Sequence, residues 1–183
     1  MFRKYKGELG LGLTAFIWGS GFIGVSISLS GGLTPLQILT IRFFIGAILL
    51  GVIFFKEIKN NITKEAVIAG SMIGVFLFIA FVFQTIGISY TTASKNAFLT
   101  AINVVIVPFI GFILYKRPLD KYGIISSIIA ILGIGILSLD VDFTINFGDF
   151  LTIICAFGFA FHIFFTGEFV KKTQSNSAYS SAI

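Results

Sequence analysis

The chain has 183 residues, of which 56% are hydrophobic and 11% charged, and its mean hydropathy is +1.01. Soluble domains carry about 25% charged residues, so a soluble particle of this composition would expose apolar patches and aggregate, and the same apolar content excludes a disordered chain. The net charge is +5, and the basic residues lie in groups of two or three between apolar runs. They form no continuous basic stripe, which excludes a nucleic-acid-binding protein.

The apolar residues fall into runs long enough to cross a lipid bilayer. A spanning helix needs about 20 apolar residues, and six segments come close to or exceed that length. Short breaks with turn residues or charges separate them and leave no room for a soluble domain. The sequence therefore predicts an all-α, polytopic membrane protein with about six transmembrane helices, at 9–29, 35–55, 66–89, 93–115, 122–139 and 148–170.

The basic residues lie almost entirely in alternate loops. Eleven of the 13 Lys and Arg residues precede the first span, lie at 56–65 or 116–121, or follow the sixth span; Lys95 alone lies on the other side, and Arg42 lies within a span. Cytoplasmic loops are enriched in Lys and Arg. This pattern predicts a cytoplasmic N-terminal tail at 1–8 in a multi-pass protein of the cell membrane, plasma or inner.

Two of the spans begin alike. Gly7–Glu8 opens the first span and Gly148–Asp149 opens the sixth, at opposite sides of the membrane because five spans separate them. Two related units of opposite topology are typical of secondary transporters, whose substrate site lies at the interface of the units near the bilayer midplane. The same offset of 141 residues matches Leu9 with Phe150, Ala15 with Ala156, Phe16 with Phe157 and Trp18 with Phe159.

Several short stretches carry a family resemblance through their order and spacing. They are AFIWGSGF at 15–22, TPL at 34–36 with IRFF at 41–44, QTIGISYTTAS at 84–94, AFLT at 97–100, VVIVP at 104–108 and GIGIL at 133–137. Together they make the chain resemble the EamA-type branch of the drug/metabolite transporter superfamily, over essentially its whole length.

The resemblance implies ten spans in two inverted five-span repeats, cytoplasmic termini and the movement of small metabolites without ATP. On that scheme 9–139 is the complete first repeat, 148–170 is the first helix of the inverted second repeat, and 171–183 is a truncated polar linker. The faces left without neighbours then predict either a missing C-terminal half or a homodimer.

The function predicted from these features is that of a secondary transporter, an exporter of metabolites or amino acids by alternating access, present as a truncated N-terminal portion. The alternative is a non-transporting membrane remnant, or an assembly or regulatory subunit. The expected partners are the lipid bilayer and a small-molecule substrate, without nucleic acid. No catalytic residues, cofactor or metal site are expected, since the acids lie in loops or at span ends and no phosphate-binding Gly-x4-Gly-Lys-Ser/Thr loop occurs.

Two residues within the first two spans are candidates for substrate contact. Arg42 lies about seven residues, or about 10 Å, below the external end of its span, where an uncompensated cation is costly. It could hold an anionic group of a substrate, or it could pair within the bundle or snorkel to the interface. Trp18 lies too deep for an interfacial belt and could stack on a substrate or pack in the core.

A set of polar residues and one proline mark the third and fourth spans. Pro108 removes the helical partner of the Val104 carbonyl, which predicts a kink in mid-span that serves either a transporter-type broken helix or packing alone. The polar side chains predict a hydrophilic pathway, with hydrogen bonds between helices as the alternative. The candidates in this set are Gln84, Asn96, Thr100 and Asn103.

Two further charged or titratable residues have simpler interpretations. Lys95 lies at the external end of its span and is expected to snorkel rather than to bind. His162 is expected to be neutral and hydrogen-bonded, because no acid in a span core is available to form a proton relay with it.

Overall fold

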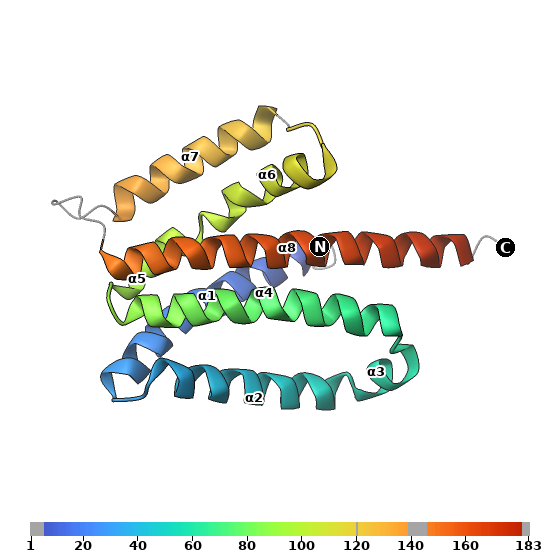
Figure 1. Cartoon of the computed structure of the whole chain (residues 1–183), viewed down its shortest axis with the longest axis horizontal. Helices are drawn as coiled ribbons and strands as arrows, with labels where there is room; N and C mark the ends of the chain where they lie inside the picture. Colours follow the sequence, from blue (N-terminus) through green and yellow to red (C-terminus); the bar gives the residue numbers. More distant parts are fainter. Residues whose placement is uncertain (1–5, 120, 139–145, 181–183) are drawn as a thin grey trace.

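The computed structural model describes residues 6–119, 121–138 and 146–180, and the regular elements in this part of the chain are all α-helices (Figure 1). In chain order they are α1 (Lys6–Ser30), α2 (Pro35–Ile53), α3 (Phe55–Asn61), α4 (Lys64–Ile88), α5 (Ala93–Thr100), α6 (Asn103–Tyr115), α7 (Lys121–Ser138) and α8 (Phe147–Ser180). Within these described ranges, five helical segments are long and apolar enough to cross a membrane, and α7 adds a shorter apolar helix. The prediction of an all-α polytopic membrane protein is confirmed.

The long helices run back and forth between two ends of the molecule (Figure 1). The loops at 31–34 and 89–92 lie at one end; α3, the loop after α6 and the last turns of α8 lie at the other. The second end carries most of the Lys and Arg residues, so we call it the basic end and the first the opposite end.

Threonine caps start three of the helices at the positions where the apolar runs begin. The hydroxyls of Thr34, Thr63 and Thr92 accept hydrogen bonds from backbone N–H groups of the first turns of α2, α4 and α5, at 3.4, 3.1 and 3.2 Å. Gln37 completes a capping box with Thr34, and Pro35 occupies the first turn of α2. These contacts satisfy N–H groups that a helix leaves unpaired.

Three segments differ from the sequence predictions. A short helix, α3, occupies part of the loop predicted at 56–65, and α8 continues to Ser180, so that most of the segment predicted as a linker at 171–183 is helical. The fourth span is divided into α5 and α6 at Ala101 and Ile102, whereas Pro108 lies inside α6. The kink predicted at Pro108 stays a prediction, and the division of the span lies more than a turn earlier.

The break between α5 and α6 shows in the hydrogen bonds around Thr100. The Thr100 hydroxyl donates to the Asn96 carbonyl at 2.8 Å, a bond to the preceding turn that often bends helices. The backbone then changes to bonds over three residues, from the Val104 N–H to the Ala101 carbonyl at 3.1 Å and from the Val105 N–H to the Ile102 carbonyl at 2.9 Å. The span is thus two helices joined by a tight 3₁₀-type turn.

Helix α8 lies at the centre of the bundle, between α4 and α6 (Figure 1). Its closest approach to α4 depends on glycines: a Cβ added to Gly148 would lie 2.5 Å from the Gly87 carbonyl oxygen, and one added to Gly158 would lie 3.0 Å from the Ala80 Cβ. Small residues at such contacts allow helix backbones to approach each other in membranes.

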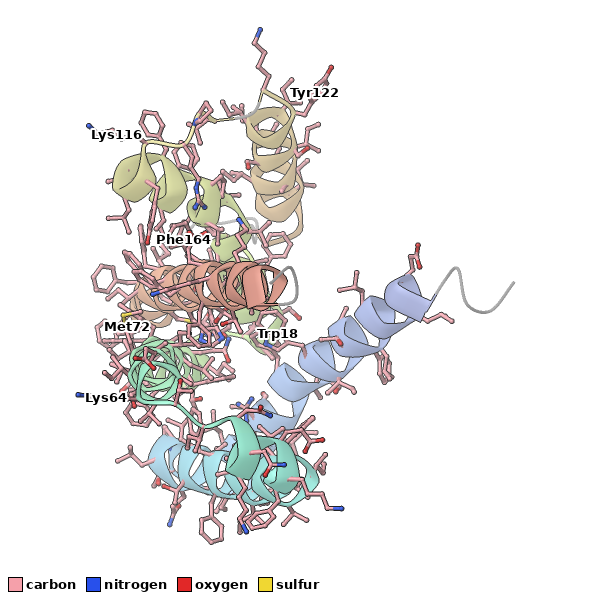
Figure 2. The ribbon with its side chains drawn as sticks, turned by 90° about the vertical axis from the view of Figure 1, so that its right-hand side faces the viewer. Trp18, Lys64, Met72, Lys116, Tyr122 and Phe164 are labelled. Carbon is pink, nitrogen blue, oxygen red and sulfur yellow. The ribbon has the colours of Figure 1, made fainter. Side chains whose placement is uncertain are left out.

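Helix α1 leans away from the other helices at its N-terminal half (Figure 2). Leu11 and Phe16 in that half are 72% and 75% exposed. The C-terminal half packs through Val25 against Ile38 of α2 and Ile88 of α4. The outer half of α1 therefore presents an apolar surface that no described residue covers.

Candidate functional site

The seven residues singled out in the sequence lie in three regions of the bundle. Gln84, Asn96, Thr100 and Asn103 lie buried near the junction of α4, α5 and α8. Trp18 and Arg42 lie at a separate meeting point of α1, α2, α4 and α8. Pro108 lines a cavity between α6 and α8 toward the basic end.

The first region is a polar seam, which we define by Gln84, Asn96, Thr100, Thr152 and Cys155. The Asn96 Nδ2 donates to the Thr152 hydroxyl at 2.7 Å and to the Gln84 carbonyl at 3.2 Å. The Gln84 Nε2 donates to the Thr100 hydroxyl at 3.3 Å, and that hydroxyl lies 3.8 Å from the Cys155 sulfur. All five residues are buried, and the contacts join α4, α5 and α8.

In this conformation the predicted pathway residues of the seam form hydrogen bonds between helices. Such bonds were the alternative to a hydrophilic pathway in the sequence analysis. Asn103 is also buried, at the first position of α6 after the break. That these residues line a transport pathway stays a prediction. Sequence reasoning missed Thr152, although it lies three residues after Asp149 on the same side of α8.

An ion pair closes the seam at the opposite end. The Lys95 Nζ lies 2.7 Å from the Asp149 Oδ2, and the two side chains are 14% and 2% exposed. Asp149 also accepts from the Thr91 hydroxyl at 2.8 Å and forms a capping box with Asn146, through two bonds of 2.9 Å. The expectation that Lys95 snorkels is wrong, because the N-terminus of α8 brings a carboxylate within reach and itself favours negative charge.

The second region is a row of aromatic rings with a cation at its end, contributed by four helices. The Trp18 ring lies edge-on to Phe159, with centroids 5.8 Å apart, and Phe159 lies edge-on to Phe81 at 5.1 Å. The Arg42 guanidinium carbon lies 4.6 Å from the centroid of the Phe81 ring, a cation–π contact. We call these four residues the aromatic–cation group.

Both predicted members of this group remain accessible. Trp18 is 41% exposed and Arg42 is half-buried. Sequence reasoning did not select Phe81 or Phe159 as site residues. The offset of 141 residues matches Phe159 with Trp18, but nothing in the sequence separates Phe81 from the other phenylalanines.

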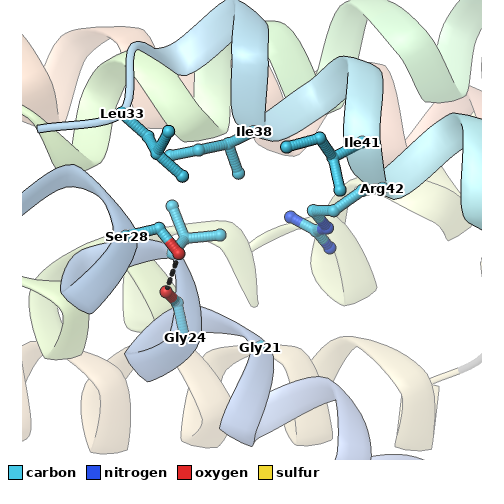
Figure 3. Close-up of a pocket in the computed structure, with 8 residues that line it drawn as sticks. Gly21, Gly24, Ser28, Leu33, Ile38, Ile41 and Arg42 are labelled. Carbon is cyan, nitrogen blue, oxygen red and sulfur yellow. Dashed lines mark hydrogen bonds between the residues drawn. The ribbon is translucent and has the colours of Figure 1, made fainter. Parts of the chain in front are cut away.

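Arg42 also lines a pocket of about 300 Å³ between α1 and α2 (Figure 3). The figure shows its guanidinium reaching from α2 toward α1 beside Ile41, with Gly24 and Ser28 on the facing wall. A Cβ added to Gly21 or Gly24 would meet no atom within 4 Å. These small residues leave open space in front of a cation.

The third region lies toward the basic end. Arg117, just after α6, forms two parallel hydrogen bonds of 2.6 Å with the Glu168 carboxylate on α8. The hydrogen bond to Glu168 raises the pKa of Arg117 above its ordinary value. Pro108, Arg117 and Lys171 line a cavity of about 430 Å³ beside the pair.

His162 lies on α8 with its Nδ1 3.1 Å from the Ile73 carbonyl oxygen of α4. Because a carbonyl only accepts, the Nδ1 carries the proton in this contact. This is the hydrogen-bonded histidine expected from the sequence, and it joins the two helices with the most extensive contact.

Comparison with known proteins gives one family. Residues 5–139 match the model of the EamA-like transporter family. The chain is 35% identical over 161 residues to a protein of Archaeoglobus fulgidus named an uncharacterized transporter, with 88% of this chain and 49% of that protein covered. A protein of Clostridium kluyveri with the same name is 31% identical over 141 residues, with coverages of 72% and 44%.

The chain thus spans about half the length of the relatives that it matches, and no solved structure matches it. The family match extends from the start of α1 to the segment after α7 and accounts for most of the chain. Its sequence, its apolar helices and its relatives agree, and the chain belongs to the EamA-like transporter family.

Proposed function

We propose that the chain forms the N-terminal part of a secondary transporter that exports a small amphipathic metabolite, an amino acid or a related compound, by alternating access. The family and the transporter names of its relatives support the general activity. The distribution of Lys and Arg supports an orientation in the cell membrane with the N-terminus and the basic end in the cytoplasm. No catalytic step or cofactor enters this proposal.

The aromatic–cation group is the observation that carries the substrate assignment. Arg42 faces open space and has no ion-pair partner among the described residues. A guanidinium in such a place binds carboxylates through paired hydrogen bonds, and the exposed face of Trp18 offers apolar contact. The group therefore suits a molecule with one anionic end and an apolar body.

The position of the group also agrees with the proposed inverted repeat. Trp18 and Phe159 are equivalent under the offset of 141 residues, and their rings are in contact. Two positions related by a two-fold operation meet only close to its axis. We infer that the axis relating the repeats passes near this contact, which is where inverted-repeat transporters hold their substrate.

A second half is needed to complete such a site. We propose that it is supplied by a C-terminal continuation, with a second copy of the chain as the alternative. The exposed outer half of α1 is the surface that this half would cover, since α8, its proposed equivalent, is packed on α4, α5 and α6.

The test uses cells that express the chain together with its second half and that are loaded with dipeptides as a source of amino acids. It measures the rate of amino-acid export by the parent and by Arg42→Gln. Charge-assisted hydrogen bonds contribute about 1.5–3 kcal/mol, so kcat/KM should fall by about 10- to 100-fold at unchanged expression. Lys64→Gln, at an exposed position of the basic end, is the control and should export normally.

Two outcomes would count against the proposal. Unchanged export by Arg42→Gln would remove Arg42 from the substrate site. Absence of export by the chain, alone and with every form of second half, would favour the alternative of a non-transporting remnant or an assembly subunit.

A further inference from the structure

We propose that α5 is a movable gate at the opposite end of the bundle and that the Lys95–Asp149 ion pair is its latch. When the latch opens, α5 swings about the turn at Ala101 and Ile102 while α6 stays fixed to α8. The role of this gate rests on the proposed transport function, in which the opposite end is external.

The turn between α5 and α6 is the hinge. Four backbone hydrogen bonds there span three residues, between 2.9 and 3.2 Å long, at the N–H groups of Ala101, Ile102, Val104 and Val105. A 3₁₀ stretch inside a helical span often marks a hinge, because its weaker geometry allows the two flanking helices to change direction. The hinge lies within the span, so the parts on each side move separately.

Helix α5 is held to α8 through three polar contacts stacked along one face of α8. Lys95 contacts Asp149 at 2.7 Å, Asn96 contacts Thr152 at 2.7 Å, and Thr100 approaches Cys155 at 3.8 Å. Polar contacts can be replaced by contacts with water at small net cost, which an apolar interface cannot. The α5–α8 contact is therefore suited to open reversibly at an aqueous end.

Two buried oxygen atoms in the same region lack a hydrogen-bond partner in the described part of the chain, the Thr85 Oγ1 and the Asn96 Oδ1. A buried polar atom without a partner raises the free energy of the closed state. Water that enters when α5 moves would solvate the Asn96 Oδ1, which lies on α5 itself. This offsets part of the cost of opening the seam.

Helix α6 is anchored differently. Its C-terminal end is tied to α8 by the paired hydrogen bonds of Arg117 and Glu168, and its middle packs through Ile110 against Ala160 and Phe164. Separating these residues would expose apolar surface as well as break the ion pair. Of the two halves of the span, α5 is the one that can leave α8.

The open gate would lead to the aromatic–cation group. Asp149, Thr152 and Cys155 follow one another along α8, and Phe159 comes one turn further. When α5 swings away, the side chains of the polar seam line a path from the external end to Phe159. The seam is thus the closed form of the hydrophilic pathway that Gln84, Asn96 and Thr100 predict.

Cys155 is the single cysteine of the chain and reports on this movement without any transport assay. It lies six residues, about 9 Å along the helix, beyond Asp149 and is fully buried. A thiol reacts as the thiolate, which needs access to water. The experiment measures labelling of Cys155 in cells by a membrane-impermeant methanethiosulfonate, and in inside-out vesicles by the same reagent.

We expect Asp149→Asn to raise external labelling at least about tenfold, since modification of a transiently opened site follows the population of the open form. Lys95→Arg keeps the ion pair and should label like the parent. Arg117→Gln breaks the anchor at the other end and should leave external labelling unchanged. Labelling of Asp149→Asn from the cytoplasmic side should stay at the parent rate.

The proposal is overturned if Asp149→Asn leaves external labelling unchanged, or if Arg117→Gln raises it equally. Equal increases from both sides would indicate general loosening of the fold and would also overturn it. Opening of α5 also breaks its contacts with α1, α4 and α7, but the labelling requires no transport. It can therefore succeed where export fails, and the failure of the gate is distinguishable from that of the transport function.

Discussion

Gly148→Ala is expected to destabilise the bundle by about 3 kcal/mol, at the upper end of the range for overpacking a well-packed interior. The added Cβ would lie 2.5 Å from the Gly87 carbonyl oxygen and 2.9 Å from the Tyr90 backbone carbonyl carbon. Neither is the end of a flexible side chain, so α8 must move off α4. The measurement is the free energy of unfolding in mixed micelles, followed by circular dichroism.

Gly167→Ala is the matched control on the same helix. A Cβ at Gly167 would meet nothing within 4 Å, and Ala is favoured over Gly inside a helix by about 1 kcal/mol. The control should therefore be stabilised slightly while Gly148→Ala is strongly destabilised. Equal effects of the two substitutions would contradict the close α4–α8 contact.

Lys95→Met is expected to cost about 3 kcal/mol of unfolding free energy, because it leaves a buried carboxylate without its cation. The Asp149 side chain is 2% exposed, so water reaches the orphaned carboxylate only when α5 opens. Its bonds to Thr91 and Asn146 remain and limit the loss. The measurement is again chemical unfolding in micelles.

The double substitution Lys95→Met with Asp149→Asn distinguishes an ion pair from mere proximity. A neutral amide at 149 removes the orphaned charge and can keep the capping contact with Asn146. The pair of changes should then cost about 1 kcal/mol, less than Lys95→Met alone. A cost equal to the sum of the two single substitutions would show that the residues do not interact.

The spans were predictable because hydropathy is a local property. Each apolar run that the sequence shows became a helix, and the threonines before α2, α4 and α5 mark their starts. The division of the fourth span was not predictable in the same way. Proline is the obvious helix breaker, yet the backbone hydrogen bonds change at Ala101 and Ile102, where neither residue is of a type that breaks helices.

The sequence predicted Arg42 and Trp18 as site residues but not the side chains that they contact. Arg42 and Trp18 stand out because a cation and a tryptophan are rare in these apolar runs. Their neighbours Phe81 and Phe159 come from helices distant in sequence. The Lys95–Asp149 pair joins residues 54 positions apart, and only the packing of α8 against α5 brings them together.

Substrate is expected to bind at the aromatic–cation group, and Trp18 reports on such binding because it is the single tryptophan of the chain. The chain is assembled in lipid nanodiscs with a second half whose tryptophans have been replaced. The measurement is the fluorescence emission of Trp18 while amino acids are titrated in. We expect a saturable change in emission that Arg42→Gln abolishes. Two results would contradict substrate binding at the aromatic–cation group. Either no transported compound changes the Trp18 emission, or the change persists in Arg42→Gln.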